Sequence, residues 1–175
     1  MSALECLSVL ARIPLIAALA FPVLGQAEGL IELVDPLDEP ERYCVDVPGF
    51  GNRLNLNAPL MAHTCKPGAA DEMFAINKPS SGQLYMPAYD RCASAESDQP
   101  GAQVFLKPCD SSPSQRFSFD SVGKIRLASG SVCLAVAEGA GQPTGGPSHL
   151  RRDLSLESCE SVEESLSEWK LPDSD

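Results

Sequence analysis

Motifs of enzyme active sites are largely missing from this sequence. It has only two histidines, His63 and His149, and neither stands in a recognisable nucleophile motif. Gly-x-Ser-x-Gly, His-Glu-x-x-His and glycine-rich phosphate loops do not occur. Carboxylates are plentiful, but nine of the 24 lie in the runs 35–41 and 157–168, which indicate solvated loop surface. Because catalysis needs a nucleophile with a base, a carboxylate pair or a metal, we expect a protein that is not an enzyme.

The sequence also lacks metal-ligand motifs and has few basic residues, and both features narrow the expected cofactors and partners. The sequence contains no Cys-x-x-Cys pair, and its two histidines are not at ligand spacing from each other, so we expect no zinc site or other metal and no cofactor. Basic residues are few, with 13 Lys and Arg against 24 Asp and Glu, and the formal net charge is −11. Such a surface repels phosphate backbones and anionic membranes, so nucleic acid is not an expected partner.

Long hydrophobic runs are also missing. Residues 13–24 (IPLIAALAFPVL) form a twelve-residue apolar run, whereas a membrane span needs about 20 helical residues. The run is typical of the central region of a signal peptide, and Gly25 and Ala27 supply small residues for cleavage after position 27. The preceding region has no net positive charge, because Glu5 offsets Arg12, and an ordinary buried helix is the alternative. We expect a signal peptide over residues 1–27 and a secreted or periplasmic protein.

The cysteines also indicate export. There are seven, at positions 6, 44, 65, 92, 109, 133 and 159. Cys6 lies in the segment to be removed, which leaves an even set of six, as a disulfide framework in an oxidising compartment requires. Six cysteines allow 15 connectivities, so their spacing alone does not select one.

A four-part pattern recurs three times along residues 28–175. Each copy has a strand-like segment after a glycine, a cysteine opening a second strand, an apolar stretch before a second cysteine, and a closing aromatic residue. The starting glycines are Gly29, Gly82 and Gly123, and the repeats cover about 29–81, 82–122 and 123–172. Because turn signals separate these short segments and helical periodicity is weak, the pattern predicts one all-β domain of about twelve strands. Residues 161–167 are expected to form at most one helical turn.

The repeat also selects a disulfide pairing. If the three units are structural copies, the only symmetric and sequential choice pairs the two cysteines within each unit, and the pairs are Cys44 with Cys65, Cys92 with Cys109, and Cys133 with Cys159. Each bridge would close a loop of roughly 17 to 26 residues, and such closure stabilises a fold by about 3 kcal/mol in chain-entropy treatments. The closing aromatics Phe74, Phe117 and Trp169 are then expected in the core.

With these motifs in place, the sequence resembles the ricin B-type lectin domains. That family's repeat runs Cys-Leu-Asp-Val, a Gly/Asn loop, Gln-Leu-Trp-x-Cys, then Asn-Gln-x-Trp. The first repeat is most similar, with Cys44-Val45-Asp46-Val47 and Asp71-Glu72-Met73-Phe74. Ser114-Gln115-Arg116-Phe117 and Ser167-Glu168-Trp169 follow in the other two repeats. The resemblance covers about 145 residues and implies a β-trefoil and carbohydrate binding.

The resemblance also implies where a sugar would bind. In the family an Asp accepts hydrogen bonds from two sugar hydroxyls, and an aromatic residue two positions before the second cysteine stacks on the sugar. A polar residue before the closing motif adds another hydrogen bond. In the first repeat these positions hold Asp46, His63 and Asp71, and Phe50 in the intervening loop offers a replacement stacking face if that loop folds over the pocket.

The corresponding positions of the other repeats do not match the family. The second repeat has Ser94, Lys107 and Ser114, and the third has Ala135, Glu157 and Ser167, so neither is expected to bind sugar in the family's manner. The chain is therefore expected to have at most one sugar site.

Each residue of that site also has a structural interpretation. Asp46 can cap a turn or bind backbone amides of its own loop. His63 can be an ordinary half-exposed strand residue, and Asp71 an ordinary loop carboxylate. Two functions follow from these alternatives. One is an exported, non-catalytic lectin that binds a glycan through the first repeat. The other is a trefoil that has lost sugar binding and acts as a secreted module or inhibitor that binds a protein partner.

Overall fold

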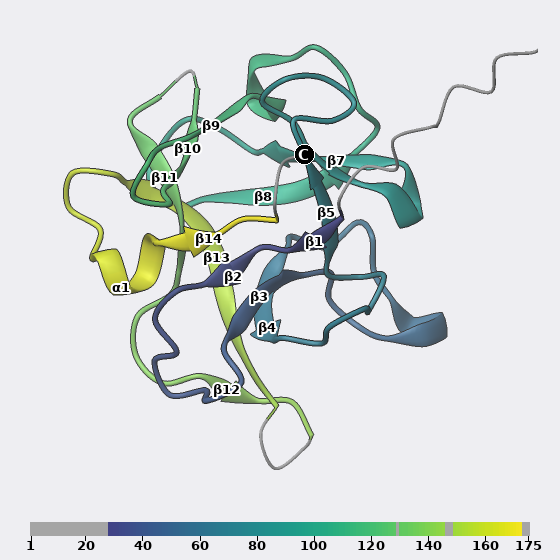
Figure 1. The fold of residues 1–175 in the computed structure, drawn as a ribbon, viewed down its shortest axis with the longest axis vertical. Coiled ribbons are helices and arrows are strands. Elements are labelled where there is room, and N and C mark those ends of the chain that lie inside the picture. The colour runs from purple at the N-terminus through teal and green to yellow at the C-terminus, as the bar shows by residue number, and fades with distance from the viewer. Residues whose placement is uncertain (1–27, 129, 146–148, 173–175) are drawn as a thin grey trace, which may run out of the picture.

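A computed structural model describes residues 28–128, 130–145 and 149–172, and these form a set of short antiparallel strands (Figure 1). The predicted signal peptide, residues 1–27, lies outside the described residues. The strands are β1 (Gly29–Leu30), β2 (Glu32–Leu33), β3 (Tyr43–Asp46), β4 (Met61–Thr64), β5 (Met73–Ile76), β6 (Leu84–Met86), β7 (Arg91–Ala95), β8 (Ala102–Lys107), β9 (Phe117–Phe119), β10 (Ile125–Leu127), β11 (Val132–Val136), β12 (Gln142–Pro143), β13 (Leu150–Ser158) and β14 (Trp169–Lys170).

Helical structure in the described residues is limited to single turns. Three are 3-10 turns, η1 (Gly51–Arg53), η2 (Pro87–Tyr89) and η3 (Pro113–Gln115), and the fourth is the helix α1 (Glu164–Ser167). The last one confirms the single helical turn expected within residues 161–167. Among the described residues, no helix has the length and apolar character that a membrane span requires.

The described residues contain 14 strands rather than about twelve. One additional strand arises because the segment after Gly29 is divided: β1 pairs with β5, whereas β2 pairs with β3 and β14. The other is β12, a two-residue strand in the loop before β13. The expected all-β architecture is confirmed, and the difference in strand number comes from the divided first segment and from β12.

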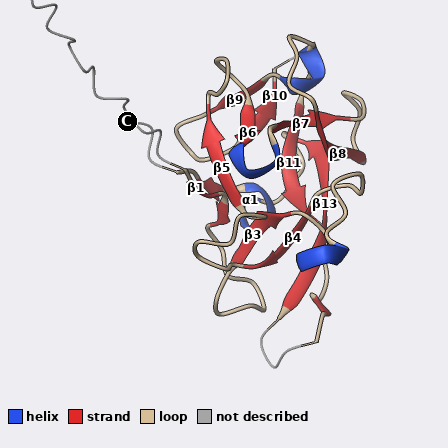
Figure 2. Cartoon of the chain, turned by 90° about the vertical axis from the view of Figure 1, so that its right-hand side faces the viewer, coloured by secondary structure: helices blue, strands red, loops and turns tan. Residues whose placement is uncertain are grey.

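Strand β13 holds the three repeats together. It has nine residues and pairs with β11 of its own repeat, with β8 of the second repeat and with β4 of the first, always antiparallel. Figure 2 shows β13 running along the molecule from β8 toward the end that carries the β12 segment. In Figure 1 the first-repeat strands β3 and β4 lie in the same half of the molecule as β12. A surface shared by the first and third repeats forms at this end.

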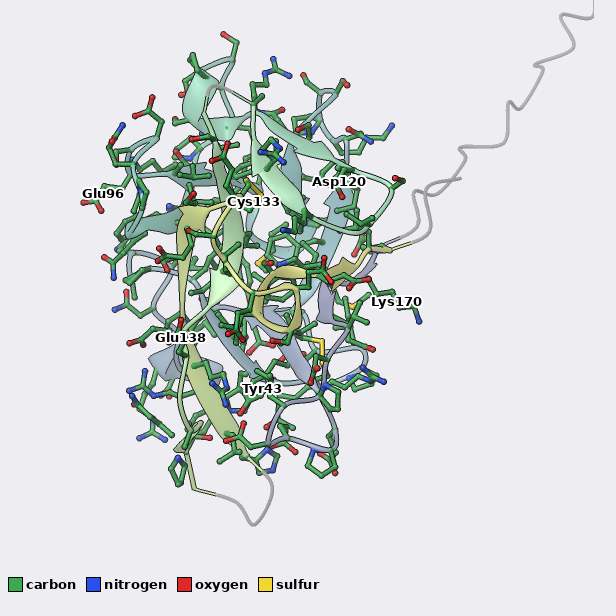
Figure 3. The ribbon with its side chains drawn as sticks, turned by 90° about the vertical axis from the view of Figure 1, so that its left-hand side faces the viewer. Tyr43, Glu96, Asp120, Cys133, Glu138 and Lys170 are labelled. Atoms are coloured by element: carbon green, nitrogen blue, oxygen red, sulfur yellow. A yellow bond between two sulfur atoms is a disulfide. The ribbon has the colours of Figure 1, made fainter. Side chains whose placement is uncertain are left out.

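The predicted disulfide pairing is confirmed. Bonds join Cys44 to Cys65, Cys92 to Cys109, and Cys133 to Cys159. In every repeat the first cysteine lies in one strand of a hairpin and the second follows the end of the partner strand within two residues, so the three bridges occupy equivalent positions. Figure 3 shows Cys133 inside the fold, whereas Glu96 and Lys170 project from its surface.

The closing aromatics are buried in one hydrophobic core, as predicted. Phe74, Phe117 and Trp169 belong to a single cluster of buried apolar side chains, and the indole N–H of Trp169 donates to the carbonyl oxygen of Leu134 at 2.9 Å. The repeat-opening Gly123 has a φ of +86°, and a Cβ there would lie 2.6 Å from the carbonyl oxygen of Trp169. This close backbone approach accounts for a glycine at that position.

The acidic run 35–41 is not simple solvated surface, which corrects the expectation from sequence. Glu39 is buried and accepts a hydrogen bond from the hydroxyl of Thr64 at 2.8 Å. Asp38 accepts from Arg152 at 2.6 Å, from the hydroxyl of Tyr43 at 2.8 Å and from the backbone N–H of Gly141 at 2.7 Å. These carboxylates tie the loop to the segment that leads through β12 into β13.

Hydrogen bonding also decides the protonation of this network. Burial alone would raise the pKa of Asp38. The hydrogen bonds from Arg152, Gly141 and Tyr43 together lower it by more than burial raises it, so the pKa lies well below its usual value. Burial, together with the hydrogen bond to Asp38, raises the pKa of Tyr43 to about 12. The carboxylate therefore stays charged and the phenol stays neutral at physiological pH, so the network keeps its bonding pattern.

Candidate functional site

Strands β3, β4, β13 and β12 lie side by side and place four side chains on one face. The register pairs Cys44 with His63, His63 with Arg151, and Arg151 with Gln142. Residues directly opposite each other in antiparallel strands share a face, as do residues two positions apart along a strand. Asp46 and Met61, which pair with each other, therefore lie on the same face as His63 and Arg151.

The loop after β3 brings Phe50 to this face. Backbone hydrogen bonds from Arg53 to Phe50 and from Asn55 to Pro48 fold residues 48–55 into a tight turn. Gly49 permits this turn because its φ is +101°, and a Cβ at this position would lie 2.2 Å from the carbonyl oxygen of Arg53. The Phe50 ring remains 64% exposed, with the guanidinium of Arg53 stacked 4.3 Å from its centroid.

A pocket of about 580 Å³ opens between this loop and the β12–β13 segment, and we call it the first-repeat pocket. Its volume lies within the range of roughly 300 to 1,000 Å³ that is usual for small-molecule sites. The described residues that line it are Asp46, Pro48, Gly49, Phe50, Met61, His63, Lys66, Thr144, Gly145, His149 and Arg151. The pocket therefore combines residues of the first and third repeats.

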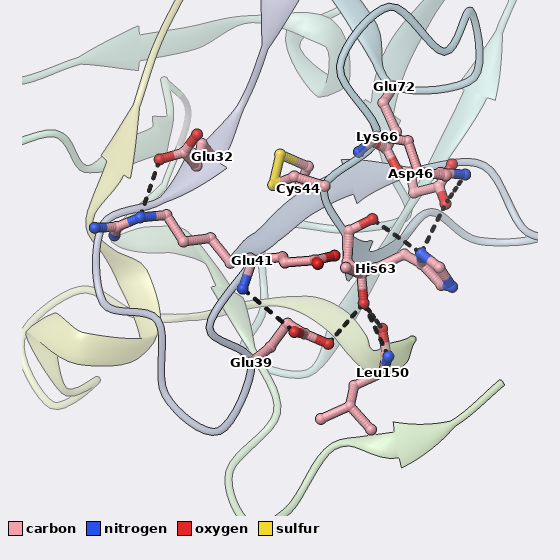
Figure 4. The surroundings of a disulfide bond; sticks show 12 residues. Glu32, Glu39, Glu41, Cys44, Asp46, His63, Lys66, Glu72 and Leu150 are labelled. Carbon is pink, nitrogen blue, oxygen red and sulfur yellow. Dashed lines mark hydrogen bonds and ion pairs between the residues drawn. A yellow bond between two sulfur atoms is a disulfide. The ribbon is translucent and has the colours of Figure 1, made fainter. Parts of the chain in front are cut away.

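Lys66 neutralises the carboxylates on the inner side of this pocket. Its ammonium nitrogen lies 3.1 Å from Oδ2 of Asp46, 3.1 Å from Oδ2 of Asp71 and 3.3 Å from Oε1 of Glu72. Figure 4 shows Lys66 beside Asp46 and Glu72, with His63 on the other side of Asp46. Asp46 is 1% exposed and Glu72 is fully buried. Asp46 thus pairs with a lysine and does not present a free carboxylate.

Burial dominates the protonation of this cluster. It raises the pKa of Asp46 to about 7, because desolvation outweighs the attraction of Lys66. It likewise raises the pKa of Glu72 to about 8, with the nearby charge of Asp46 acting in the same direction. Burial alone would lower the pKa of Lys66, but the carboxylates of Asp46 and Glu72 hold it above its usual value. The lysine therefore remains charged while the carboxylates share protons near neutral pH.

The two histidines of the chain meet in the pocket. Their rings are stacked with centroids 6.0 Å apart and an interplanar angle of 23°. The His63 ring lies 3.1 Å from the carbonyl oxygen of Thr64 through Nδ1 and 3.0 Å from the hydroxyl of Thr144 through Nε2. Burial is the main cause that lowers the pKa of His63. His63, at the position where the resemblance implies an aromatic side chain, thus stacks on His149 of the third repeat.

The cluster also contains atoms of types that bind metal ions. Donor atoms of Asp46, His63 and Glu72 lie within 4.8 Å of one another. The ammonium group of Lys66 already contacts both carboxylates, so a metal ion would have to displace it. The geometry therefore fits a lysine-neutralised cluster better than a metal centre.

The equivalent positions of the other repeats are arranged differently. In the second repeat the hydroxyls of Ser94 and Ser114 lie 3.2 Å apart, so the two side chains bind each other. Gln115, retained from the family pattern, is buried and donates to the carbonyl oxygen of Pro108. In the third repeat Glu157 accepts a hydrogen bond from Ser155 at 2.6 Å. These positions serve internal hydrogen bonding.

Three of the four ligand-binding residues predicted from sequence line the first-repeat pocket: Asp46, Phe50 and His63. The fourth, Asp71, contacts Lys66 but is not among the lining residues. Sequence reasoning missed Lys66, Thr144, His149 and Arg151. The position of Lys66 directly after Cys65 was an available signal, whereas the other three come from a distant segment that only strand pairing brings close.

Comparison with known proteins identifies the family. The sequence model of the ricin-type beta-trefoil lectin domain matches residues 37–165. The chain belongs to this family, and this membership supports carbohydrate binding at the level of the family. Among curated proteins no match is found.

Solved structures show the same fold at low sequence identity. The designed three-fold symmetric protein ThreeFoil superposes with a TM-score of 0.60 at 14% identity, over 83% of this chain and 97% of that one. The β-trefoil lectin of the Vibrio vulnificus hemolysin/cytolysin, with N-acetyl-D-lactosamine bound, gives 0.53 at 14% identity, over 86% and 96%. The agglutinin from Abrus precatorius gives 0.57 at 15% identity, over 83% of this chain and 49% of that one.

Proposed function

We propose that this protein is an exported, non-catalytic carbohydrate-binding protein with a single glycan site in the first-repeat pocket. The observation that carries the proposal is the pocket itself. It has a volume of about 580 Å³ and is lined by Asp46, His63 and Phe50, the three residues that the family resemblance and the loop position point to. A pocket of this size accommodates one or two sugar units.

The side chains around the pocket suit a sugar ring. Phe50 presents an exposed aromatic face, and the stacked rings of His63 and His149 present another. Aromatic faces cover the C–H groups of a ligand without requiring polar partners. In this proposal Asp46 acts through Lys66, which it holds at the inner side of the pocket. Asp71 forms an ion pair with Lys66 and does not contact the ligand.

A single site follows from the other two repeats. Ser94 and Ser114 bind each other in the second repeat, and Ala135 offers no polar group in the third. Neither repeat has a carboxylate at the position where the family's Asp accepts sugar hydroxyls. Export is supported by the three disulfides, which are typical of proteins that fold in an oxidising compartment.

The test is a glycan-array screen of the oxidised protein, with Phe50→Ala and Asp46→Ala as variants. We expect binding to a defined glycan set, which Phe50→Ala weakens at least tenfold because the exposed ring is lost from the pocket rim. Val122→Ala is the matched control, since Val122 is also a strongly exposed apolar residue, 59% exposed, and does not line the pocket. Absence of binding to any glycan would contradict the proposal.

One observation favours a second candidate, a protein-binding module that has lost sugar recognition. Lys66 binds both carboxylates, Asp46 and Asp71, that correspond to the sugar-binding positions of the family. With a negative array result, the exposed Phe50 would mark a contact for a protein partner instead. Loss of partner binding in Phe50→Ala, but not in Val122→Ala, would then support this second function.

A further inference from the structure

Basic side chains gather in the first-repeat pocket although the chain as a whole is acidic. The sequence carries 24 acidic and 13 basic residues and a net charge of −11. Yet the described lining residues include Lys66, Arg151 and both histidines of the chain, whereas the only acidic one among them is Asp46. The pocket thus differs in charge from the rest of the molecule.

The hydrogen-bond acceptors of the pocket are already engaged or buried. Asp46 is 1% exposed, its Oδ2 binds Lys66, and its Oδ1 has less than 1 Å² of exposed surface. The hydroxyl of Thr144 donates to the carbonyl oxygen of His149 and contacts Nε2 of His63. The family's way of holding sugar hydroxyls, an accessible aspartate, is therefore not available in this pocket.

Arg151 and His149 supply accessible side-chain donors. The side chain of Arg151 is 40% exposed, with Nη2 donating to Oε1 of Gln142 at 2.6 Å and Nη1 lying 3.6 Å from Asp153. A guanidinium has five N–H donors in a planar fork that fits carboxylate and sulfate oxygens, so several remain for a ligand. The ring of His149 makes no hydrogen bond to any described residue and stacks on His63. This pocket therefore presents hydrogen-bond donors to a ligand, whereas the family's sites present an aspartate that accepts hydrogen bonds.

Neighbouring carboxylates oppose this positive charge only weakly. Asp46 and Glu72 share protons near neutral pH, because burial raises the pKa of Asp46 to about 7 and that of Glu72 to about 8. Asp71 is held by Lys66. The side chain of Asp153 is 74% exposed, so water and salt screen it from Arg151. Arg53, stacked on Phe50 at the rim, adds a further positive charge.

We propose that the first-repeat pocket binds an anionic sugar, one that carries a carboxylate or a sulfate, with Arg151 as its principal partner. This inference rests on the proposed function and narrows it to a ligand class. In this arrangement Phe50 and the histidine rings cover the apolar face of the sugar. Arg151 and His149 donate to its anionic group, and Lys66 keeps Asp46 from repelling that group.

The experiment compares matched glycans that differ only in charge. Binding of the oxidised full-length protein is measured to N-acetyllactosamine and to its sialylated and sulfated forms, and to glucose and glucuronic acid conjugates. We expect at least one anionic member to bind at least tenfold more tightly than its neutral partner. The sialylated and sulfated arms show whether the carboxylate or the sulfate is recognised. Raising the salt concentration is expected to reduce this difference, because screening weakens charge pairing.

Arg151→Gln is the decisive variant. It should abolish the preference for the anionic member, whereas Arg126→Gln, which changes an arginine in β10 outside the pocket lining, should keep it. His149→Gln, which changes the residue just before β13, gives a second test in case Arg151→Gln folds poorly, as judged by thermal unfolding, and it should reduce the preference for the anionic member. Equal affinity for charged and neutral glycans would overturn this inference and leave the proposed function standing. Binding to no glycan at all would overturn both.

Discussion

Lys66 directly follows Cys65, and its ammonium group contacts the carboxylates of Asp46, Asp71 and Glu72. Two of these carboxylates are almost completely buried. Buried charges without partners are costly, so one lysine stabilises a group that would otherwise repel itself. At the scale of single residues, this cluster determines both the stability of the first repeat and the chemistry of its pocket.

Replacing Lys66 with Met tests the stabilising role of the ammonium group. At pH 8 we expect Lys66→Met to lower the free energy of unfolding by about 2 kcal/mol, below the usual cost of breaking a buried ion pair because 31% of the side chain is exposed. At pH 5 the loss should be smaller, since Asp46 and Glu72 are then protonated. Urea unfolding with intact disulfides measures the difference. Lys107→Met, at an exposed strand position, is the control, and equal losses at both pH values would contradict this role.

The same cluster predicts how stability depends on pH. The folded-state pKa values of Asp46 and Glu72, about 7 and about 8, lie above their ordinary values. The folded protein therefore holds protons that the unfolded chain has released, and this contribution to stability falls as pH rises from about 4 to about 8. Glu72→Gln should flatten this fall, whereas the exposed Glu138→Gln should not. An unchanged slope in Glu72→Gln, measured by urea unfolding across that range, would refute the assignment.

At the scale of elements, the loop of residues 48–55 controls Phe50. Gly49 has a φ of +101° and no room for a side chain, whereas Gly51 has a φ of +54° and no atom within 4 Å of the place that a Cβ would occupy. We expect Gly49→Ala to destabilise the protein by more than about 1 kcal/mol and to weaken glycan binding by displacing Phe50. Gly51→Ala, the control, should have a smaller effect on both. Equal effects in thermal unfolding and binding would contradict the role assigned to Gly49.

The disulfides provide a second test at this scale. The bridges between Cys44 and Cys65 and between Cys92 and Cys109 span 21 and 17 residues. Because the loop lengths are similar, replacing either pair with Ala should cost a similar 2 to 5 kcal/mol, roughly the usual range. Only loss of the first pair should also weaken glycan binding, because Cys65 precedes Lys66. Equal losses of binding in both double variants would argue against a site in the first repeat.

Sequence patterns predict the elements of this fold well, because the cysteines, glycines and closing aromatics mark each repeat. They also point to Asp46, His63 and Phe50, which belong to one hairpin and its loop. They do not reveal Arg151 or His149, because these residues join the pocket through the pairing of β13 with β4. The buried Glu39 and the ion pairs of Lys66 were missed for a related reason, since charged residues in loops look solvated until their tertiary partners are known.

At the scale of the whole molecule, the three repeats share a scaffold and differ in their surface chemistry. The core aromatics and the disulfides are equivalent in all three, whereas Asp46, Phe50 and His63 of the first repeat line a pocket and the equivalent Ser94 and Ser114 of the second repeat bind each other. The long strand β13 couples the repeats, so residues of the third repeat complete a pocket of the first. The proposed function therefore predicts one glycan site per chain.

Stoichiometry follows from this asymmetry. Calorimetric titration with a glycan identified by the array should give one binding site per chain. Ser94→Ala and Ser114→Ala, at the second repeat's equivalent positions, should leave both the stoichiometry and the affinity unchanged. A value of two or three sites per chain would show that the other repeats also bind.

Mapping where a glycan binds tests the proposed first-repeat site without any substitution. Amide chemical shifts of the isotope-labelled protein, recorded by NMR during titration with an array-selected glycan, report the location residue by residue. We predict shifts that concentrate in residues 46–66, 144–145 and 149–151, which contain the described lining residues of the first-repeat pocket. Shifts centred on Ser94 and Ser114, or on the third repeat away from β12 and the start of β13, would contradict it.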